Sequence, residues 1–298
     1  MRRSANLSVA ISTLDRPEAL ARCLDALLGG EMLPAEVVVV DQSGNCATKD
    51  LVEQRQASTA PIQYMRQARR GLSASRNYAI SHARCRVVAV TDDDCVPDPQ
   101  WTSAIERTFA SPTAPDALTG RILSLCTDIP GLFKVATRES TQRTEFRGKV
   151  LPWLVGGGGN FAVRRDWFLR IGGCDERLGV GSSGKAAEDM DFFYRLLRAG
   201  GSIRYEPEAL IYHEPKSKSE RMTRHWSYGY GIGAFSGIWL RRGDWYALRV
   251  LTHWVGTHCR DLALAIGRRQ RFEAHQKRLI LQGTVRGLLY GLRVPSAE

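Results

Sequence analysis

The sequence has no C-x-x-C pair, no apolar run near its first residue and no uninterrupted apolar segment that could span a membrane. Its seven cysteines are scattered and odd in number, which favours free thiols in a reducing compartment over a disulfide framework. A spanning helix needs about 18 consecutive apolar residues, and the opening stretch MRRSANLSVAISTLDRP lacks the apolar core of a secretory signal. We therefore expect a cytoplasmic protein without a spanning helix.

Internal repeats and low-complexity tracts are also absent, while 43% of the 298 residues are hydrophobic and 24% are charged. This composition predicts a globular chain with one large domain or two small ones. The net charge of +11 is unevenly placed: residues 1–214 hold 27 Lys and Arg against 26 Asp and Glu, whereas residues 215–298 hold 15 against 5. The basic C-terminal part therefore suits a polyanionic partner, such as nucleic acid or anionic lipid.

The N-terminal part alternates short β-branched strands with helices. Strands are predicted at LSVAIST (Leu7–Thr13), AEVVVV, IQYMRQ and RVVAVT, and helices near 18–28 and after Gly71. Such a pattern is typical of a parallel sheet with both faces covered, on which ligands bind beyond the carboxyl ends of the strands. The acids and hydroxyls that fall at those ends are Thr13, Asp15, Asp41 and Asp92–Asp94.

The run VTDDDCVPD places three adjacent carboxylates, Asp92–Asp94, directly after a buried strand. They repel one another, and a solvated turn of acids is the simplest explanation. A divalent cation would relieve the repulsion, because hard ions such as Mg²⁺ and Mn²⁺ prefer carboxylate oxygens. The strand-end position favours this metal site. His213, at the end of the later strand ALIYH, offers an imidazole that suits Mn²⁺.

The middle of the chain, about 100–214, has a predicted strand ALTGRILSL, a glycine run WLVGGGGNFAVRRDWF, an amphipathic helix DMDFFYRLLRAGG and a strand SIRYEPEALIYHE. Gly179–Lys185 has the spacing of a phosphate-binding loop. The next residue is Ala186 instead of the hydroxyl residue that would hold Mg²⁺, and no strand precedes the loop. The stretch GYGIGAFSG lacks the spacing of a dinucleotide fingerprint. Neither segment is predicted to bind a nucleotide.

Glu188 and Asp189 begin the predicted amphipathic helix. Acids in a first helical turn complement the helix dipole, which is the plain structural explanation. The same position would keep Asp189 ionised, as a general base must be. Asp191 is the alternative base, and it lies about 200° around the helix from Asp189. We favour Asp189 because it continues the apolar face that includes Phe193.

Together these motifs resemble family 2 inverting glycosyltransferases, which have the GT-A fold. The segments that carry the resemblance are VAISTLDRPEALARCLDAL, VVVVDQSG, GLSASRN, VTDDDCVPDPQW, GGGGNFAVRRD and AEDMDFFYRLLRAGG, within about residues 7–214. It implies an α/β fold with a Rossmann-like, mixed but mainly parallel sheet flanked by helices. Residues 1–100 would form the nucleotide-sugar half, 101–214 the acceptor half and 215–298 a basic, aromatic-rich helical extension.

The resemblance also implies roles for single residues. Those that would bind the nucleotide are Thr13, Asp15, Arg16, Asp41, Arg76, Asp92 and Asp93, with Asp41 at the base. Those that would hold the metal are Asp94, Asp92 and His213. Glu188 and Asp189 would be catalytic, and the acceptor would meet Trp153, Gly157, Gly158, Asn160 and Asp191. The first motif, STLDRP, departs from the commoner form with Tyr and Asn, so contacts at Asp15 are expected to differ.

The implied reaction is a metal-dependent, inverting transfer of a sugar from a nucleoside-diphosphate sugar to a hydroxyl of a glycan or lipid-linked acceptor, with Mn²⁺ or Mg²⁺. One alternative, a sugar nucleotidyltransferase, would be expected to carry a glycine-rich loop after the first strand, which ISTLDRPEAL lacks. A non-catalytic nucleotide-sugar-binding homologue is the other. The segment 215–298 either packs as a helical cap or lies on an anionic membrane surface, which would place the protein peripherally at the inner face of the cell membrane. No nucleic-acid-binding motif accompanies its charge.

Overall fold

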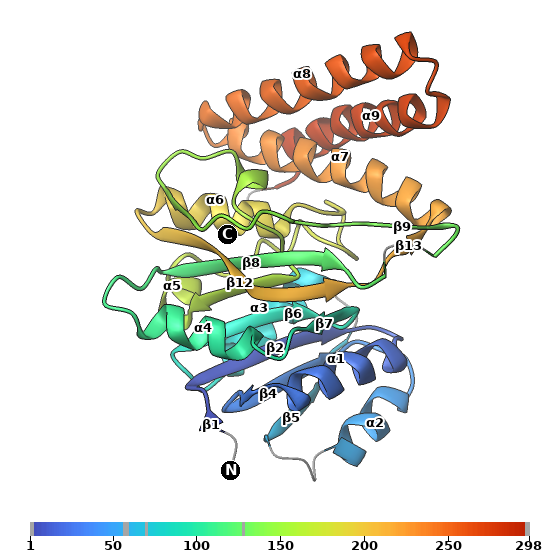
Figure 1. The fold of residues 1–298 in the computed structure, drawn as a ribbon. Coiled ribbons are helices and arrows are strands. Elements are labelled where there is room, and N and C mark those ends of the chain that lie inside the picture. Colours follow the sequence, from blue (N-terminus) through green and yellow to red (C-terminus); the bar gives the residue numbers. More distant parts are fainter. Residues whose placement is uncertain (1–2, 56–59, 69–70, 127–128, 296–298) are drawn as a thin grey trace.

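A nine-stranded sheet forms the centre of the protein in the computed structural model, which describes residues 3–55, 60–68, 71–126 and 129–295 (Figure 1). Its order is β10-β12-β8-β11-β6-β2-β4-β5, and β7 pairs with β12 at the side. The strands are β2 (Leu7–Thr13), β4 (Glu36–Asp41), β5 (Ile62–Arg66), β6 (Val87–Asp92), β7 (Cys95–Pro97), β8 (Ala117–Ser124), β10 (Thr144–Arg147), β11 (Asn160–Arg164) and β12 (Ser202–His213).

The half of the sheet made of β5, β4, β2 and β6 is parallel, as the sequence predicts. Thr13 lies opposite Asp41, and Ser12 lies opposite Asp92. The polar residues that end these strands therefore meet at one edge of the sheet, where parallel sheets bind ligands.

The other half is mixed. Strand β11 runs antiparallel between β6 and β8, and its first residue, Asn160, lies opposite Thr91 near the end of β6. Strand β12 runs parallel to β8, and its last residue, His213, pairs with Cys95 of β7. The start of β11 and the end of β12 thus reach the same edge as the aspartates, which brings the two halves of the chain to one place.

Helices cover both faces of the sheet (Figure 1). Because side chains alternate along a strand, Val9 and Ile11 of β2 pack towards α1 and α4, whereas Ala10 packs towards α3, α5 and α6. The helices are α1 (Pro17–Gly29), α2 (Ala47–Arg55), α3 (Leu72–His82), α4 (Trp101–Ala110), α5 (Arg165–Arg170) and α6 (Glu188–Arg198), with the 3₁₀ turn η1 (Pro152–Leu154). Short pairs are formed by β1 (Arg3–Ser4) with β3 (Met32–Leu33), and by β9 (Leu132–Phe133) with β13 (Lys216–Ser217).

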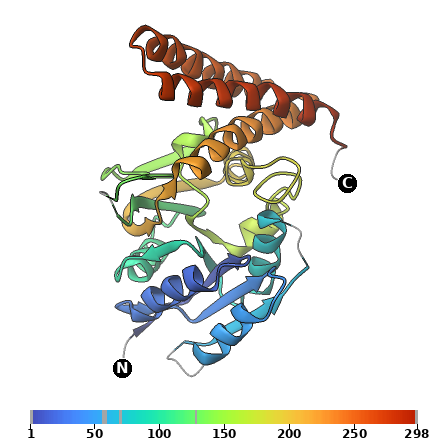
Figure 2. The same ribbon diagram turned by 90° about the vertical axis from the view of Figure 1, so that its right-hand side faces the viewer.

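The C-terminal extension is helical, as predicted, and its three helices stack above the sheet (Figures 1 and 2). They are α7 (Lys218–Arg241), α8 (Tyr246–Gly267) and α9 (Arg271–Arg293). The stretch GYGIGAFSG lies inside α7, so it is a helix segment instead of a nucleotide loop. Within the described ranges, no helix combines the length and apolarity that a membrane crossing requires.

Helices α7 and α9 touch along a seam of glycines, which we call the glycine seam. Its members, spaced four apart on each helix, are Gly229, Gly233, Gly237, Gly283, Gly287 and Gly291. A Cβ atom on Gly287 would lie 1.9 Å from the carbonyl oxygen of Tyr230, and one on Gly283 would lie 2.3 Å from that of Trp226. Only hydrogen atoms fit between these backbones, so the seam fixes how closely the two helices pack.

The sheet and its cores draw on residues before and after position 100, since Leu7, Leu118 and Ile211 belong to one cluster. The division into a nucleotide-sugar half and an acceptor half stays a prediction about function. The boundary between the sheet and the C-terminal extension is clearer, because the capping box of Ser217 and Glu220 marks the start of α7.

Candidate active site

Asp93, one of the acids at the strand ends, is fully buried and has two side-chain partners. Its carboxylate accepts a hydrogen bond of 2.8 Å from the Thr13 hydroxyl and forms an ion pair of 2.6 Å with Arg16. Burial raises the pKa of Asp93 to about 7, although the positive charge of Arg16 acts in the opposite direction. Arg16, from the turn after β2, therefore offsets part of the repulsion within the aspartate run.

Asp94 has three positive or polar neighbours. Its Oδ2 atom lies 2.9 Å from Nη1 of Arg16 and 2.8 Å from Nζ of Lys216. Burial would raise the pKa of Asp94, but the charges of His213, Arg16 and Lys216 outweigh it and hold the pKa below its ordinary value. Asp94 is therefore ionised, and its other oxygen, Oδ1, faces His213.

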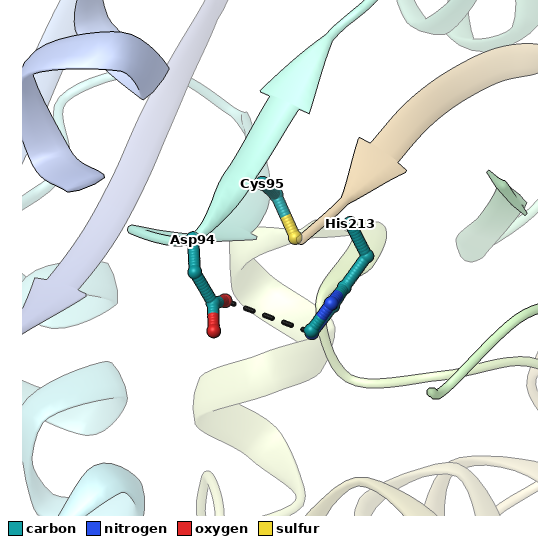
Figure 3. Close-up of side chains that lie close together, drawn as sticks. All are labelled: Asp94, Cys95 and His213. Carbon is teal, nitrogen blue, oxygen red and sulfur yellow. Dashed lines mark ion pairs between the residues drawn. The ribbon is translucent and has the colours of Figure 1, made fainter. Parts of the chain in front are cut away.

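Asp94, Cys95 and His213 form a cluster whose ligand atoms all lie within 4.8 Å of one another (Figure 3). Oδ1 of Asp94 lies 3.6 Å from Nε2 of His213. Nδ1 of His213 is 2.7 Å from the carbonyl oxygen of Glu214, which only accepts, so Nδ1 carries a hydrogen, and a bound cation would take the place of a proton on Nε2, whose lone pair then faces Oδ1 of Asp94. A cation fits between two such electron-rich atoms.

The third member of the cluster is a weaker candidate. Burial raises the pKa of the Cys95 thiol well above its ordinary value, so the sulfur stays protonated. A protonated sulfur is a poor ligand for a hard ion, whereas oxygen and imidazole nitrogen suit Mn²⁺ and Mg²⁺. The donors that fit such an ion are thus Asp94 and His213.

Arg76 of α3 connects the aspartate run to the acids of α6. Its guanidinium lies 2.9 Å from carboxylate oxygens of both Asp92 and Glu188 and donates a 2.9 Å hydrogen bond to the carbonyl of Gly158. Although burial lowers its pKa, the charges of Asp92 and Glu188 more than offset this, so Arg76 stays charged. One buried cation thus holds three segments of the chain together.

Asp189 lies beside the glycine run. Its Oδ2 atom accepts a 2.7 Å hydrogen bond from the backbone N–H of Gly158, and its Oδ1 atom accepts one of 2.8 Å from Met190. Burial raises the pKa of Asp189, with Arg76 acting against it, and burial likewise raises that of Glu188. A carboxylate that is held in place and is more basic than usual suits proton abstraction.

Gly158 and Gly159 of the glycine run lie so close to neighbouring side chains that a larger residue would not fit at either position. A Cβ atom on Gly158 would lie 2.9 Å from the Asp189 side chain and 3.0 Å from that of Arg76. One on Gly159 would lie 2.9 Å from Oδ2 of Asp92. The backbone of the run therefore forms part of the site, and side chains there would displace the acids.

Asp15 and Asp41, which are predicted to bind the nucleotide, lie at the carboxyl ends of β2 and β4. Asp41 is fully buried and accepts hydrogen bonds from Tyr64 and from the backbone of Ser43. Asp15 has a left-handed backbone with φ of 54° and bonds to Gly44. Both acids therefore lie at the same edge of the sheet as Asp92–Asp94.

Two residues that were predicted to contact the acceptor, Asp191 and Asn160, instead bind other residues of the protein interior. The carboxylate of Asp191 forms a 2.7 Å ion pair with Arg195 and accepts a 2.8 Å hydrogen bond from the indole of Trp239, which ties α6 to α7. Asn160 bonds to Trp101 through its oxygen and to two backbone carbonyls through its nitrogen. Neither side chain lines the cavity described next.

A cavity of about 330 Å³ lies between the acids and the extension. The predicted site residues that line it are Arg76, Asp92, Trp153, Gly157, Gly158, Glu188, Asp189 and His213. The opposite wall was not predicted from the sequence. We call it the extension wall, and it consists of Arg224, Tyr228 and Ile232 of α7 and Trp254 of α8. Arg224, Tyr228 and Ile232 are spaced four residues apart, so the sequence predicts that they share one face of a helix. It does not predict that this face lies opposite the acids.

The chain matches two family models. Residues 8–172, more than half of the chain, match the one described as Glycosyl transferase family 2, and residues 138–238 match Glycosyltransferase like family 2. The chain belongs to glycosyl transferase family 2. The resemblance seen in the sequence is thereby confirmed.

Several known proteins are about a quarter identical to this chain over the aligned residues. Chondroitin synthase of Escherichia coli is 26% identical in an alignment of 257 positions, which covers 73% of this chain and 36% of that protein. Pre-mycofactocin glycosyltransferase of Mycobacterium tuberculosis is 26% identical in an alignment of 223 positions, which covers 72% of this chain and 43% of that protein. This chain thus spans less than half the length of these two relatives. Succinoglycan biosynthesis protein ExoM of Rhizobium meliloti is 28% identical, with 70% and 67% covered.

Solved structures with the same fold confirm the predicted GT-A architecture. The mannosyltransferase PcManGT from Pyrobaculum calidifontis, solved with GDP-Man and Mn²⁺, has a TM-score of 0.64 at 16% identity and covers 97% of this chain and 88% of its own. Residues 1–349 of TarS from S. aureus, solved with UDP-GlcNAc, have a TM-score of 0.56 at 14% identity and cover 94% and 90%. At these identities the likeness concerns the fold alone.

Proposed function

We propose that this family 2 chain is a metal-dependent, inverting glycosyltransferase that moves a sugar from a nucleoside-diphosphate sugar to a hydroxyl of a glycan or lipid-linked acceptor. One observation carries the proposal: acids from β6 and α6, joined by Arg76, surround a cavity at the carboxyl edge of the parallel strands. The names of the relatives and the ligands in the related structures support it.

In this proposal the donor lies over the ends of β2, β4 and β6. Asp41 would contact the nucleotide base and Asp93 the ribose or the sugar. The remaining residues on this side are Thr13, Asp15, Arg16, Arg76 and Asp92. Arg16 already pairs with Asp93 and Asp94, so its cation is placed where a diphosphate would arrive.

Asp94 and His213, with Asp92, would hold Mn²⁺ or Mg²⁺. When bound, the ion balances the charge of the departing nucleoside diphosphate. Asp189 takes the proton of the acceptor hydroxyl as this attacks the anomeric carbon from the face opposite the leaving group, and Glu188 holds Arg76 beside it. A single displacement of this kind inverts the anomeric configuration. The acceptor would meet Trp153, Gly157 and Gly158.

Nucleoside diphosphates are expected to raise the melting temperature only in the presence of Mn²⁺ or Mg²⁺. At a ligand concentration 100 times Kd the stabilisation would be about 2.7 kcal/mol, which is a shift of several degrees in thermal-shift measurements. Asp94→Ala should lose this shift, whereas Asp25→Ala, which removes an exposed acid on α1, should keep it. A shift in Asp94→Ala equal to that of the wild type would contradict the assignment of the metal site.

The products separate the rival functions. With the donor found by thermal shift, the proposal expects transfer to a hydroxyl acceptor with inversion. Accumulation of nucleoside-diphosphate sugar from a sugar phosphate and a nucleoside triphosphate would indicate a nucleotidyltransferase. Binding without hydrolysis or transfer, for every donor that binds, would indicate a non-catalytic homologue.

We also propose that the outer face of α9 lies on an anionic membrane. Its exposed residues within an arc of about 120° are Arg271, His275, Arg278, Gln282, Val285, Arg286, Leu289, Leu292 and Arg293. Val285 is 60% exposed, and the acid on α9, Glu273, points to another side. Apolar side chains flanked by arginines suit the headgroup region of anionic lipid.

Vesicles that contain phosphatidylglycerol are expected to sediment the protein at low salt, and vesicles of phosphatidylcholine alone are not. The double variant Arg286→Glu, Arg293→Glu should lose most of this binding, because each basic residue contributes about 1 kcal/mol near such a surface. Lys49→Glu, an exposed reversal on α2, should retain it. Absence of sedimentation of the wild type at low salt would remove the membrane proposal.

A further inference from the structure

The extension wall brings a second tryptophan to the cavity that contains Asp189. Trp254 lies on α8, beyond residue 238 where the family-model matches end. Its ring centroid is 5.4 Å from that of Trp153, and the two ring planes are inclined by 53°. Trp153 comes from η1, so two distant segments supply one aromatic corner of the cavity.

The polar edge of Trp254 is turned away from the cavity. Its Nε1 donates a 3.1 Å hydrogen bond to the Thr284 hydroxyl on α9, and that hydroxyl donates in turn to the carbonyl of Ile280. Thr284 is buried beside the glycine seam, so it cannot easily move. The indole is thus fixed by its N–H, and the part of its surface that lines the cavity is apolar.

The cavity reaches from the acids to the extension wall. Arg76, Asp92 and His213, which the proposed function assigns to the donor and the metal, lie on one side of it, and Thr13, Asp15 and Asp41 do not line it. The other side, formed by the glycine run and the extension wall, is where the acceptor would lie. A pyranose ring has an apolar face of C–H groups and a rim of hydroxyls. An aromatic surface beside a fixed carboxylate matches both parts of such a ring, because the C–H face packs on the indole while a hydroxyl reaches the acid.

We propose that Trp254, together with Trp153, binds the apolar face of a pyranose ring in the acceptor and so selects acceptors whose reacting hydroxyl is carried by a sugar. Thr284 is the positioning residue that orients Trp254. The inference deepens the proposed function and rests on it. It assigns acceptor choice to a helix outside the segments that the family models match.

Binding is tested first, by saturation-transfer NMR with methyl glycosides of glucose, galactose, mannose and N-acetylglucosamine, with and without nucleoside diphosphate and Mn²⁺. Wild type should transfer saturation to ring C–H protons of at least one glycoside. Trp254→Leu should lose most of that signal, Trp254→Phe should keep part of it, and Thr284→Val should weaken it. Trp245→Leu, which removes a tryptophan that is 76% exposed and outside the cavity, should match the wild type.

Kinetics then separate a ligand contact from mere helix packing. Trp254→Leu should raise the KM for the sugar acceptor about tenfold, which corresponds to about 1.4 kcal/mol, and leave the KM for the donor unchanged. An unchanged acceptor KM, or a raised donor KM instead, would overturn the inference. So would a wild type that binds nucleoside diphosphate with Mn²⁺ but none of the glycosides. Failure to bind any nucleotide, with glycoside binding intact, would count against the proposed function alone.

Discussion

Asp189→Asn is expected to lower the rate of glycosyl transfer by about 10²- to 10⁴-fold, the usual contribution of a general base. The amide keeps the size of the side chain and can still accept the hydrogen bond from Gly158, so the fold should persist. It cannot take the proton of the acceptor hydroxyl. Turnover of the purified variant with the donor found by thermal shift, alongside its melting temperature, measures both effects.

Asp191→Asn is the matched comparison, since it makes the same change two residues away. Asp191 pairs with Arg195 and Trp239, so its loss should lower the melting temperature while folded molecules remain active. Full turnover by Asp189→Asn, with inactivity of folded Asp191→Asn, would reverse the assignment. Because burial raises the pKa of Asp189, the acid limb of the wild-type activity profile should lie above the pH range in which an ordinary aspartate titrates.

Gly287→Ala is expected to destabilise the extension by about 1–3 kcal/mol or more, the range seen when an atom is forced into a packed interface. The new Cβ would lie 1.9 Å from the carbonyl oxygen of Tyr230, which belongs to a helix backbone and cannot turn aside. Helices α7 and α9 would have to separate. Chemical denaturation and hydrogen exchange of residues in α7 and α9 would detect the change.

Gly256→Ala is the control, because Gly256 lies within α8 and has no atom within 4 Å of the position of a Cβ. Replacing a helical glycine with alanine without a clash should stabilise the protein by about 0.5–1 kcal/mol. Opposite signs for the two substitutions are the expected result. Equal effects would mean that the close approach at Gly287 does not limit the packing of the helices.

The sequence predicted the features that depend on local patterns. The run Val37–Val40 is buried on both faces and therefore apolar throughout, and Leu7–Thr13 is a strand with the predicted bounds. The helix predicted near 18–28 spans Pro17–Gly29, because its apolar residues recur at helical spacing and a proline begins it. The same patterns predicted that the acids at the strand ends lie together, since parallel strands end at one edge of the sheet.

Features that depend on contacts between distant segments could not be predicted in this way. Lys216 pairs with Asp94 across more than a hundred residues, and no local pattern encodes that ion pair. Trp254 reaches the cavity only because three helices stack over the sheet. The sequence also gave no signal for α2, whose buried residues in the structure are only Thr48 and Val52.

The glycine seam also sets the order in which the active site can be completed during synthesis. The nearest neighbours of Gly229, Gly233 and Gly237 in α7 all belong to residues 280–292 of α9, so this glycine face stays uncovered until that segment has left the ribosome. Asp189 is synthesised 95 residues before Thr284, and the indole N–H of Trp254 has no acceptor until Thr284 follows. At usual elongation rates the time between the synthesis of Asp189 and that of Thr284 is roughly 5–20 s. In a nascent chain Glu188 and Asp189 would thus precede the extension wall opposite them by seconds.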